Sequence, residues 1–325
     1  MMKLVTVTMI RNDSDVVEAF VRHHLSLADH LVILDHGSTD ATPAILRSLQ
    51  AEGLPLTVLH DPSLSFQQGP RITELARQAF TRLGADFVFP LDADEFLKVE
   101  SRLALERALA AVPNGQCGQI AWQNHVVTEG DNAACVNPVE RMRFRASVEP
   151  KDEHKVILSR RMIDDTRWQV SPGNHFLSRE LTHGTETAVA CYLPSVRIAH
   201  FPIRSQEQLH QKIILGWLSA RLQNPVDIKA ADTAVAHDAQ FWHWKDLFAA
   251  TLGNPVIATA QLQQYALALY VHKHRISDVN PPLPLLEDPL PVNYSLKYTR
   301  PETGVALTSL ARWTDQLLTR VGEML

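Results

Sequence analysis

Two aspartates separated by one small residue, Asp92 and Asp94, directly follow the apolar run at residues 87–91. When a strand has just ended, two carboxylates so placed can reach one hard cation, and Mg²⁺ or Mn²⁺ prefers carboxylate oxygens together with substrate phosphates. Such a cation would neutralise a diphosphate leaving group as its bond to a sugar breaks. The alternative interpretation is an acidic helix N-cap. The position of the pair at a strand end favours the metal site.

Polar residues also follow the first two predicted strands. The first leads into Arg11 and Asn12, and the second ends at Asp35. In an open parallel sheet, ligands bind beyond the carboxyl ends of the strands, so these residues are candidates for a nucleotide site. Asp35 could accept a hydrogen bond from a base or ribose, or it could bond to the backbone of its own loop. Asp40 is predicted to cap the turn before the next helix.

The elements that would position these residues alternate between strand and helix. Short apolar, β-branched runs are typical of buried parallel strands, and helices between them indicate right-handed crossovers in a mostly parallel sheet. Asp15 and Glu18 have the spacing of a capping box at a helix start. The predicted strands are 4–10, 31–34, 56–59 and 87–91, and the predicted helices after the first begin at Thr42 and Arg71 and end near Gly53 and Gly84.

The second half of the chain is less regular and then becomes helical. Its predicted strands are 119–127, 141–144, 155–160 and 195–201, with a polar loop at 128–137, and its predicted helices are 101–111, 206–223, 243–252, 257–272 and 307–325. A proline-dense stretch at 280–291 is typical of an extended linker. The predicted division is a nucleotide-binding α/β domain at 1–205 and a helical C-terminal extension at 206–325.

Composition narrows the possible functions. A chain of 325 residues with a formal net charge of −5 lacks the basic surface that nucleic-acid binding requires. Three widely spaced cysteines indicate a reducing compartment. The chain has no signal peptide pattern and no apolar stretch of about 18 residues, so we expect a cytoplasmic protein, with contact at the inner face of the membrane left open. Trp217, Trp242 and Trp244 could stack on sugars or lie in a membrane interface, although ordinary helix packing is the simpler interpretation.

Three segments together resemble a known family. Residues 5–13, 31–40 and 89–97 are similar to the glycosyltransferase family 2-like group, and the Asp-Glu-Phe-Leu form at 94–97 is similar to a bacterial subgroup that acts in surface polysaccharide assembly. The resemblance covers about residues 3–215. Shorter blocks at 122–124, 154–157, 173–175 and 200–205 also resemble that subgroup.

The resemblance implies a GT-A-type, Rossmann-like, mostly parallel sheet flanked by helices, and it says little about the helical C-terminal extension. It implies a nucleotide-diphosphate sugar donor, a divalent metal (Mn²⁺ or Mg²⁺), inversion at the anomeric carbon, and a saccharide or lipid-linked acceptor. His200 is favoured over His175 as a third metal ligand because it ends a strand-like run and precedes Arg204. The positions that match the family's nucleotide contacts are Thr8, Asn12, Asp35, Arg71, Asp92 and Arg204, and the implied metal ligands are Asp92, Asp94 and His200.

An inverting transferase needs a general base beside the acceptor hydroxyl. The family's usual Glu-Asp pair has no clean equivalent in this chain. Glu153 is the first choice, with His175 as the second, and Glu149 and Asp152 fall in the same region. Glu95 could orient the metal site or pair with a nearby cation.

The chain lacks a motif that two alternative enzyme classes usually need. A sugar nucleotidyltransferase or a dinucleotide oxidoreductase usually needs a glycine-rich loop after the first strand, and Arg11-Asn12-Asp13-Ser14-Asp15 contains no glycine. A non-catalytic nucleotide-sugar binder that keeps the fold is disfavoured by the intact Asp92 and Asp94 and is left open by the missing base motif.

Overall fold

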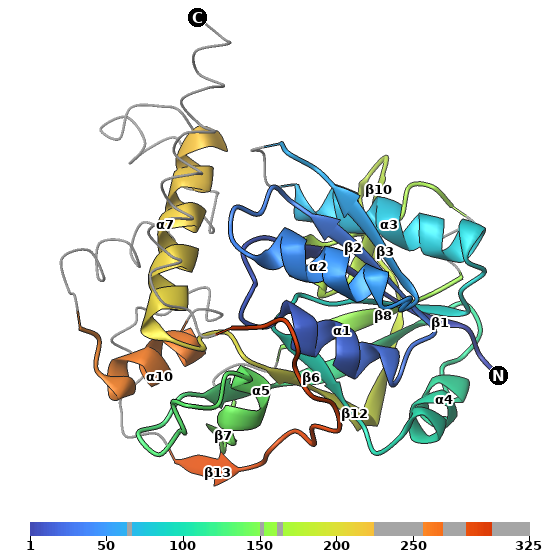
Figure 1. Ribbon diagram of the computed structural model, residues 1–325. Helices are drawn as coiled ribbons and strands as arrows, with labels where there is room; N and C mark the ends of the chain where they lie inside the picture. The colour runs from blue at the N-terminus through green and yellow to red at the C-terminus, as the bar shows by residue number, and fades with distance from the viewer. Residues whose placement is uncertain (64–66, 150–152, 161–164, 224–255, 269–283, 301–325) are drawn as a thin grey trace, which may run out of the picture.

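The computed structural model confirms the predicted α/β class (Figure 1). It describes residues 1–63, 67–149, 153–160, 165–223, 256–268 and 284–300. The parallel part of the central sheet consists of β1 (Leu4–Ile10), β2 (His30–Asp35), β3 (Leu56–His60) and β4 (Phe87–Pro90), in the order β4-β1-β2-β3. Ile10 pairs with Asp35, so the polar loops after β1 and β2 leave the sheet from the same edge.

Helices cover both faces of this sheet. Alternate residues of β1 point to opposite faces, as the pleat requires: Leu4 and Ile10 pack with one set of helices, and Val5 and Val7 with the other. The first set contains α1 (Val17–Leu25), α2 (Thr42–Ala51) and α4 (Arg102–Ala110), and the second face carries α3 (Gln68–Arg82).

Beyond β4 the sheet continues through four longer-range pairings. The strands are β5 (Glu95–Lys98), β6 (Cys117–Val126), β8 (His154–Ser159) and β12 (Ala190–His200). β8 lies antiparallel to both β4 and β6, whereas β12 is parallel to β6 and antiparallel to β5. His200 therefore pairs with Glu95 on one side and Asn124 on the other, which brings the end of β12 beside the segment that contains Asp92 and Asp94.

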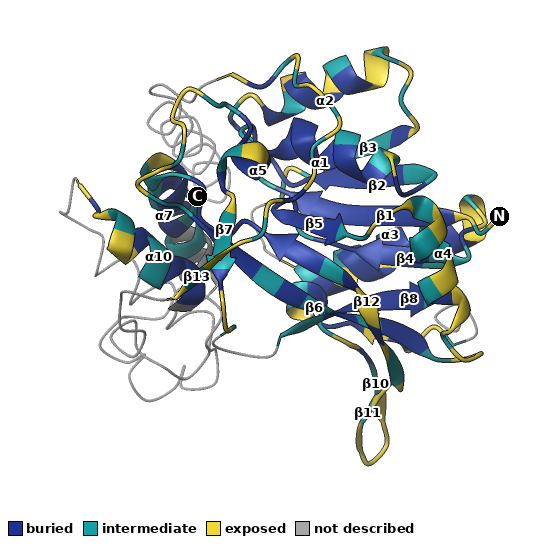
Figure 2. Cartoon of the chain, turned by 90° about the horizontal axis from the view of Figure 1, so that it is seen from below, coloured by how far each residue is buried: buried dark blue, intermediate teal, exposed yellow. Residues whose placement is uncertain are grey.

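A small second sheet was not predicted. It contains β9 (Gln169–Val170), β10 (Leu177–Leu181) and β11 (Gly184–Thr187), with a short 3-10 turn, η1 (Pro172–Asn174), before β10. Figure 2 shows the β10–β11 hairpin projecting from the body of the protein with an exposed tip. Its residues alternate weakly and carry many charges, so they give little strand signal in the sequence.

Two local predictions were wrong. Residues 141–144 were expected to be a strand, but a short helix, α5 (Pro138–Arg141), comes first and β7 (Phe144–Ala146) follows. Asn137 begins this helix because its side chain accepts a hydrogen bond from the Val139 amide (3.2 Å), and Pro138 suits the first turn. The capping box at Asp15 and Glu18 is also absent: α1 begins at Val17 without a side-chain cap among the described residues.

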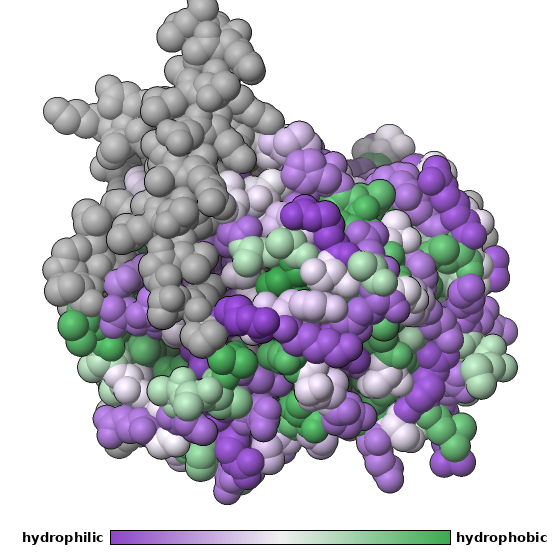
Figure 3. All heavy atoms as spheres, in the orientation of Figure 1, coloured by the Kyte–Doolittle hydropathy of each residue, from purple (hydrophilic) through white to green (hydrophobic). Residues whose placement is uncertain are grey.

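The predicted helix at 206–223 is confirmed as α7 (Gln206–Gln223), and α10 (Thr259–Ala268) lies within the predicted helix at 257–272. The predicted helices at 243–252 and 307–325, with Trp242 and Trp244, lie outside the described residues. No helix in the described part of the chain is both long and apolar enough to cross a bilayer. In Figure 3, the hydrophobic residues of the coloured surface form small scattered groups.

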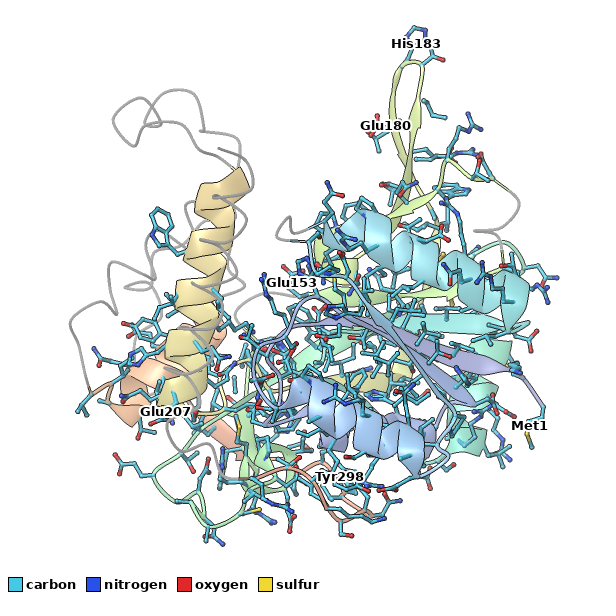
Figure 4. All side chains as sticks on the ribbon, turned by 45° about the horizontal axis from the view of Figure 1, so that its top comes forward. Met1, Glu153, Glu180, His183, Glu207 and Tyr298 are labelled. Atoms are coloured by element: carbon cyan, nitrogen blue, oxygen red, sulfur yellow. The ribbon has the colours of Figure 1, made fainter. Side chains whose placement is uncertain are left out.

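Residues 284–300, which we call the return segment, pack against the first half of the chain. β13 (Leu285–Glu287) adds to the sheet edge by pairing antiparallel with β7, and Leu290 is buried in the core. Further along, Glu18 of α1 accepts hydrogen bonds from the amides of residues 297–299 (2.8–2.9 Å). Figure 4 shows Tyr298 beside α1. Residues 284–291 of the proline-dense stretch are extended, as expected, but they pack on the core instead of forming a free linker; residues 280–283 lie outside the described residues. The division at residue 205 stays a prediction.

Candidate functional site

Asp94 lies at the carboxyl edge of the parallel strands, where three basic side chains surround its carboxylate. Lys212 of α7 donates to Oδ2 (3.1 Å), the Nη1 atom of Arg204 lies 3.7 Å from Oδ2, and His200 Nε2 lies 3.7 Å from Oδ1. The Asp94 carbonyl also accepts the Phe201 amide (2.8 Å), so β12 fixes the backbone. Burial alone would raise the pKa of Asp94, but the surrounding charges, with Lys212 the largest, lower it below its usual range. Asp94 is therefore ionised at neutral pH.

His200 is held by two neighbours on β6. Its Nδ1–H donates to Asn124 Oδ1 (2.7 Å), and its ring stacks on Trp122 with centroids 4.7 Å apart. A carboxamide oxygen can only accept, so the proton of the neutral ring is on Nδ1 and the lone pair is on Nε2. Burial lowers the pKa of His200 to about 3, which keeps the ring neutral at physiological pH.

Asp92 belongs to a second, adjoining network. Its Oδ2 atom accepts from Lys155 (2.8 Å), and its Oδ1 atom accepts from Gln68 of α3 (2.7 Å) and from Asn174 of η1 (3.2 Å). Lys155 of β8 is fully buried and also pairs with Glu95 (2.8 Å). Lys155 thus links the two carboxylates. Glu95 pairs with this cation and also accepts from the Asp92 amide (2.9 Å), so it both contacts a cation and holds the segment that contains Asp92.

The Lys155 network is electrostatically tight. Burial raises the pKa of Glu95 well above its usual value, although Lys155 opposes that shift. For Lys155 itself burial acts to lower the pKa, and the charges of Asp92 and Glu95 outweigh it, so the pKa is raised. The ammonium group also lies 4.9 Å from the centre of the Trp122 ring. Since Trp122 also stacks on His200, one aromatic ring contacts both networks.

Asn12 and Asp35, two of the predicted nucleotide residues, each bond to the backbone of the loop after β2. Asn12 Oδ1 accepts from the Thr39 amide (2.7 Å), and Asp35 Oδ1 accepts from the Ser38 amide (3.0 Å), as its loop interpretation required. Asp40 caps the turn before α2 by accepting from the Thr42 amide (2.9 Å), which confirms that prediction.

Two further predicted nucleotide residues, Thr8 and Arg71, differ in exposure. Thr8 is wholly buried within β1. Arg71 of α3 forms an ion pair with Asp61 and donates to Ser63 Oγ (2.8 Å), and its side chain is 23% exposed.

Arg204 is buried with three aspartates rather than exposed to a ligand. Its side chain is 1% exposed and bonds to Asp15 (2.5 and 2.8 Å) and to Asp13 (3.3 Å), in addition to its approach to Asp94. Burial raises the pKa of Asp13 to about 7, and Arg204 partly offsets the shift. Arg204 therefore joins the loop after β1 to the start of α7.

The base candidates Glu153 and His175 are brought together. Glu153 Oε2 lies 3.5 Å from His175 Nδ1, which donates to the His154 carbonyl (2.9 Å). A side chain at position 173 would collide with the His175 ring, so Gly173, whose φ is +73°, is required there. Figure 4 shows Glu153 on the side of the sheet that faces α7. Asp152 lies outside the described residues.

The structure assembles two of the three predicted metal ligands as a facing pair. No group of three or more His, Cys, Asp or Glu side chains in the described ranges is placed to hold a metal. Asp94 Oδ1 and the lone pair of His200 Nε2, however, face each other across 3.7 Å. Two ligands of one divalent cation can have this separation, because each bond is about 2.1 Å long. Substrate phosphates commonly supply further ligands of Mg²⁺. Asp94 and His200 therefore fit such a cation.

Sequence reasoning missed three residues that the site uses: Lys212, Lys155 and Asn124. Asn124 and Lys155 lie in blocks that carry the family resemblance, and that location was the available signal. Lys212 had none, because nothing local in a long helix indicates which lysine returns to a distant aspartate.

Comparison with known proteins adds distant similarities only. No protein-family model and no curated protein matches the chain. Among solved structures, the chain is similar to one assigned as a glucose-1-phosphate thymidylyltransferase from Bacillus anthracis in complex with a sucrose (8% identity, TM-score 0.27, 72% of this chain and 80% of that chain covered). It is also similar to a mannose-1-phosphate geranyltransferase from Thermus thermophilus (10% identity, TM-score 0.27, 77% and 65% covered). A function for the protein therefore follows from the arrangement of side chains around Asp94.

Proposed function

We propose that the protein is a glycosyltransferase that takes a sugar from a nucleotide-diphosphate donor and uses a divalent cation (Mn²⁺ or Mg²⁺) held by Asp94 and His200. The observation that carries the proposal is the facing pair of an ionised carboxylate and a neutral imidazole lone pair at the carboxyl edge of the parallel strands. This edge is where open α/β sheets bind their ligands. The family resemblance of residues 3–215 supports the same reaction class.

Each part of the site then has a role. The cation, when bound, stabilises the negative charge that develops on the leaving diphosphate. Asp94 and His200 hold it, and Lys212, whose ammonium group already lies at Asp94, binds the diphosphate oxygens. The nucleoside is oriented by Asp92, Asn12, Asp35 and Arg71. Arg204, which is buried, positions Asp94. Glu153, with His175 beside it, is the candidate base that accepts the proton of the acceptor hydroxyl.

The test is release of nucleoside diphosphate from a panel of nucleotide sugars with Mn²⁺ present. We expect slow hydrolysis with at least one donor, lost on chelation and lost in Asp94→Asn. Asp86→Asn is the matched control, because Asp86 lies at the opposite end of the sheet, where it accepts from the Lys3 amide.

The alternative activities give different results. A sugar nucleotidyltransferase would instead release pyrophosphate from a nucleoside triphosphate and a sugar 1-phosphate. A non-catalytic binder would retain nucleotide sugars without turnover in either assay. Either pattern would overturn the proposal.

A further inference from the structure

A chain of short hydrogen bonds leads from Glu149, just after β7, to His200. Glu149 Oε1 accepts from the Asn124 amide (2.8 Å), and Oε2 accepts from Asn124 Nδ2 (2.6 Å). The other end of the Asn124 carboxamide accepts from His200 Nδ1 (2.7 Å). Asn124 and His200 are direct partners across β6 and β12, and both are buried. Asn124 holds His200 in the site described above, and the contact of Glu149 with Asn124 has no role in that account.

The direction of each bond follows from what each group can do. Both oxygens of Glu149 act as acceptors here, so Asn124 turns its NH₂ toward Glu149 and its oxygen toward His200. That oxygen also only accepts, so His200 must carry its proton on Nδ1. In a neutral ring, Nε2 is then the unprotonated nitrogen on the side of Asp94.

Asp94 by itself would favour the opposite arrangement. Its carboxylate lies 3.7 Å from Nε2 and would attract a proton on that nitrogen. A ring protonated on Nε2 cannot bind a metal through that atom. The Glu149–Asn124 pair is the group that opposes this tendency, and the Trp122 ring holds the imidazole plane while it does so.

We propose that Glu149 is a positioning residue that acts through Asn124 to fix the tautomer of His200 with its proton on Nδ1. The consequence for the cation rests on the proposed function, whereas the tautomer itself does not. Partners that orient a ligating histidine in this way typically contribute a factor of about 10 to 100 in metal affinity.

The experiment is ¹⁵N NMR of the metal-free full chain with labelled histidine, which distinguishes protonated from unprotonated ring nitrogens. We expect His200 to show N–H at Nδ1 in the wild type. In Glu149→Gln, the introduced amide uses its oxygen for the Asn124 backbone N–H and turns its NH₂ toward the Asn124 side chain. That side chain must then flip, and the proton of His200 should move to Nε2. Affinity for Mn²⁺, measured by calorimetry, should fall at least about tenfold.

A second substitution provides the rescue. In Asn124→Asp combined with Glu149→Gln, the new carboxylate can accept from both the introduced amide and His200 Nδ1, so the wild-type tautomer should return. Glu140→Gln, an exposed carboxylate on α5, is the matched control and should change nothing. A general packing defect would not reverse in the double variant.

The outcomes separate the two proposals. If the tautomer switches and is rescued but the wild type binds no Mn²⁺, the cation site fails and the role of Glu149 stands. A wild-type His200 protonated on Nε2 overturns the inference, as does an unchanged tautomer in Glu149→Gln. If Glu149→Gln does not fold, the tautomer of His200 in the wild type and in the double variant still tests the inference.

Discussion

The Nζ atom of Lys212 lies 3.1 Å from Asp94 Oδ2. An ammonium group from α7 is therefore hydrogen-bonded to the carboxylate that we propose as a ligand of a divalent cation. The two positive charges compete for one group when no nucleotide is bound. When a diphosphate is present, the same ammonium can bind its oxygens. The side chain is 30% exposed, which leaves it accessible to such a ligand.

This relationship predicts opposite effects from a single substitution. In Lys212→Gln, affinity for Mn²⁺ alone should rise several-fold because the competing charge is gone. Affinity for a nucleoside diphosphate in the presence of Mn²⁺ should fall about tenfold, equivalent to about 1.4 kcal/mol. Calorimetric titrations of both ligands measure the pair of effects. The control is Lys297→Gln, which removes an exposed ammonium group paired with Glu52. Equal changes in the same direction for both ligands would contradict the assignment.

The buried cation Lys155 should be essential for folding stability. Lys155→Met leaves Glu95 fully buried without its partner, and breaking such a pair costs about 3–5 kcal/mol. Adding Glu95→Gln removes the buried carboxyl group that has lost its partner and should recover a large part of the loss. Urea denaturation of the wild type, the single variant and the double variant gives the coupling. A loss below about 1 kcal/mol in the single variant would contradict a stabilising role for the buried Lys155–Glu95 pair.

Glu18 should anchor the return segment. Its carboxylate accepts three backbone amides at residues 297–299 and pairs with Arg22 (2.9 Å). Glu18→Gln should therefore lower the free energy of unfolding by about 2–3 kcal/mol, because charged hydrogen bonds and a buried acceptor are lost. It should also speed hydrogen exchange at those three amides. Glu287→Gln, whose pair with Arg143 is half-exposed, should change stability by less than about 1 kcal/mol. Unchanged exchange at 297–299 would contradict this role.

Two buried histidines in α1 should make stability depend on pH. His23 donates to the Leu97 carbonyl (2.7 Å), and burial lowers its pKa to about 4; burial also lowers the pKa of His24 well below its usual value. Below pH 6.5 the unfolded chain takes up protons that the folded chain excludes. Stability should therefore fall as the pH decreases from 6.5 toward 4, by up to about 1.4 kcal/mol per pH unit for each histidine.

The variant His23→Gln isolates one of these groups. Its amide can keep the bond to Leu97 but does not titrate. The change in the free energy of unfolding per pH unit should therefore be smaller than in the wild type by up to about 1.4 kcal/mol. Urea denaturation at pH 6.5, 5.5 and 4.5 measures the slope. Identical slopes for the variant and the wild type would mean that His23 is protonated in the fold.

Features that depend on neighbouring residues in the chain were predicted from the sequence, whereas contacts between distant residues were not. β1 to β4 and their helices were predicted because apolar periodicity and glycine stops such as Gly53 and Gly84 are local. Asp94 and His200 lie 3.7 Å apart, and their role as metal ligands stays a prediction. Lys212 and the bonds of Glu18 to residues 297–299 were not foreseen, since contacts across 118 to 281 residues leave no local pattern. The capping interpretation of Asp15 and Glu18 failed for the same reason: both side chains have distant partners.

The return segment also constrains the order in which the protein can be built during synthesis. The sheet edge at β7 gains its neighbour, and α1 its anchor at Glu18, only from residues 285–299. A nascent chain that has reached residue 205 therefore holds every strand of the parallel sheet but still exposes the hydrophobic surface that Leu290 will cover. Completion of the amino-terminal half must wait for the return segment to be synthesised, a period in which exposed apolar surface makes the growing polypeptide prone to aggregation.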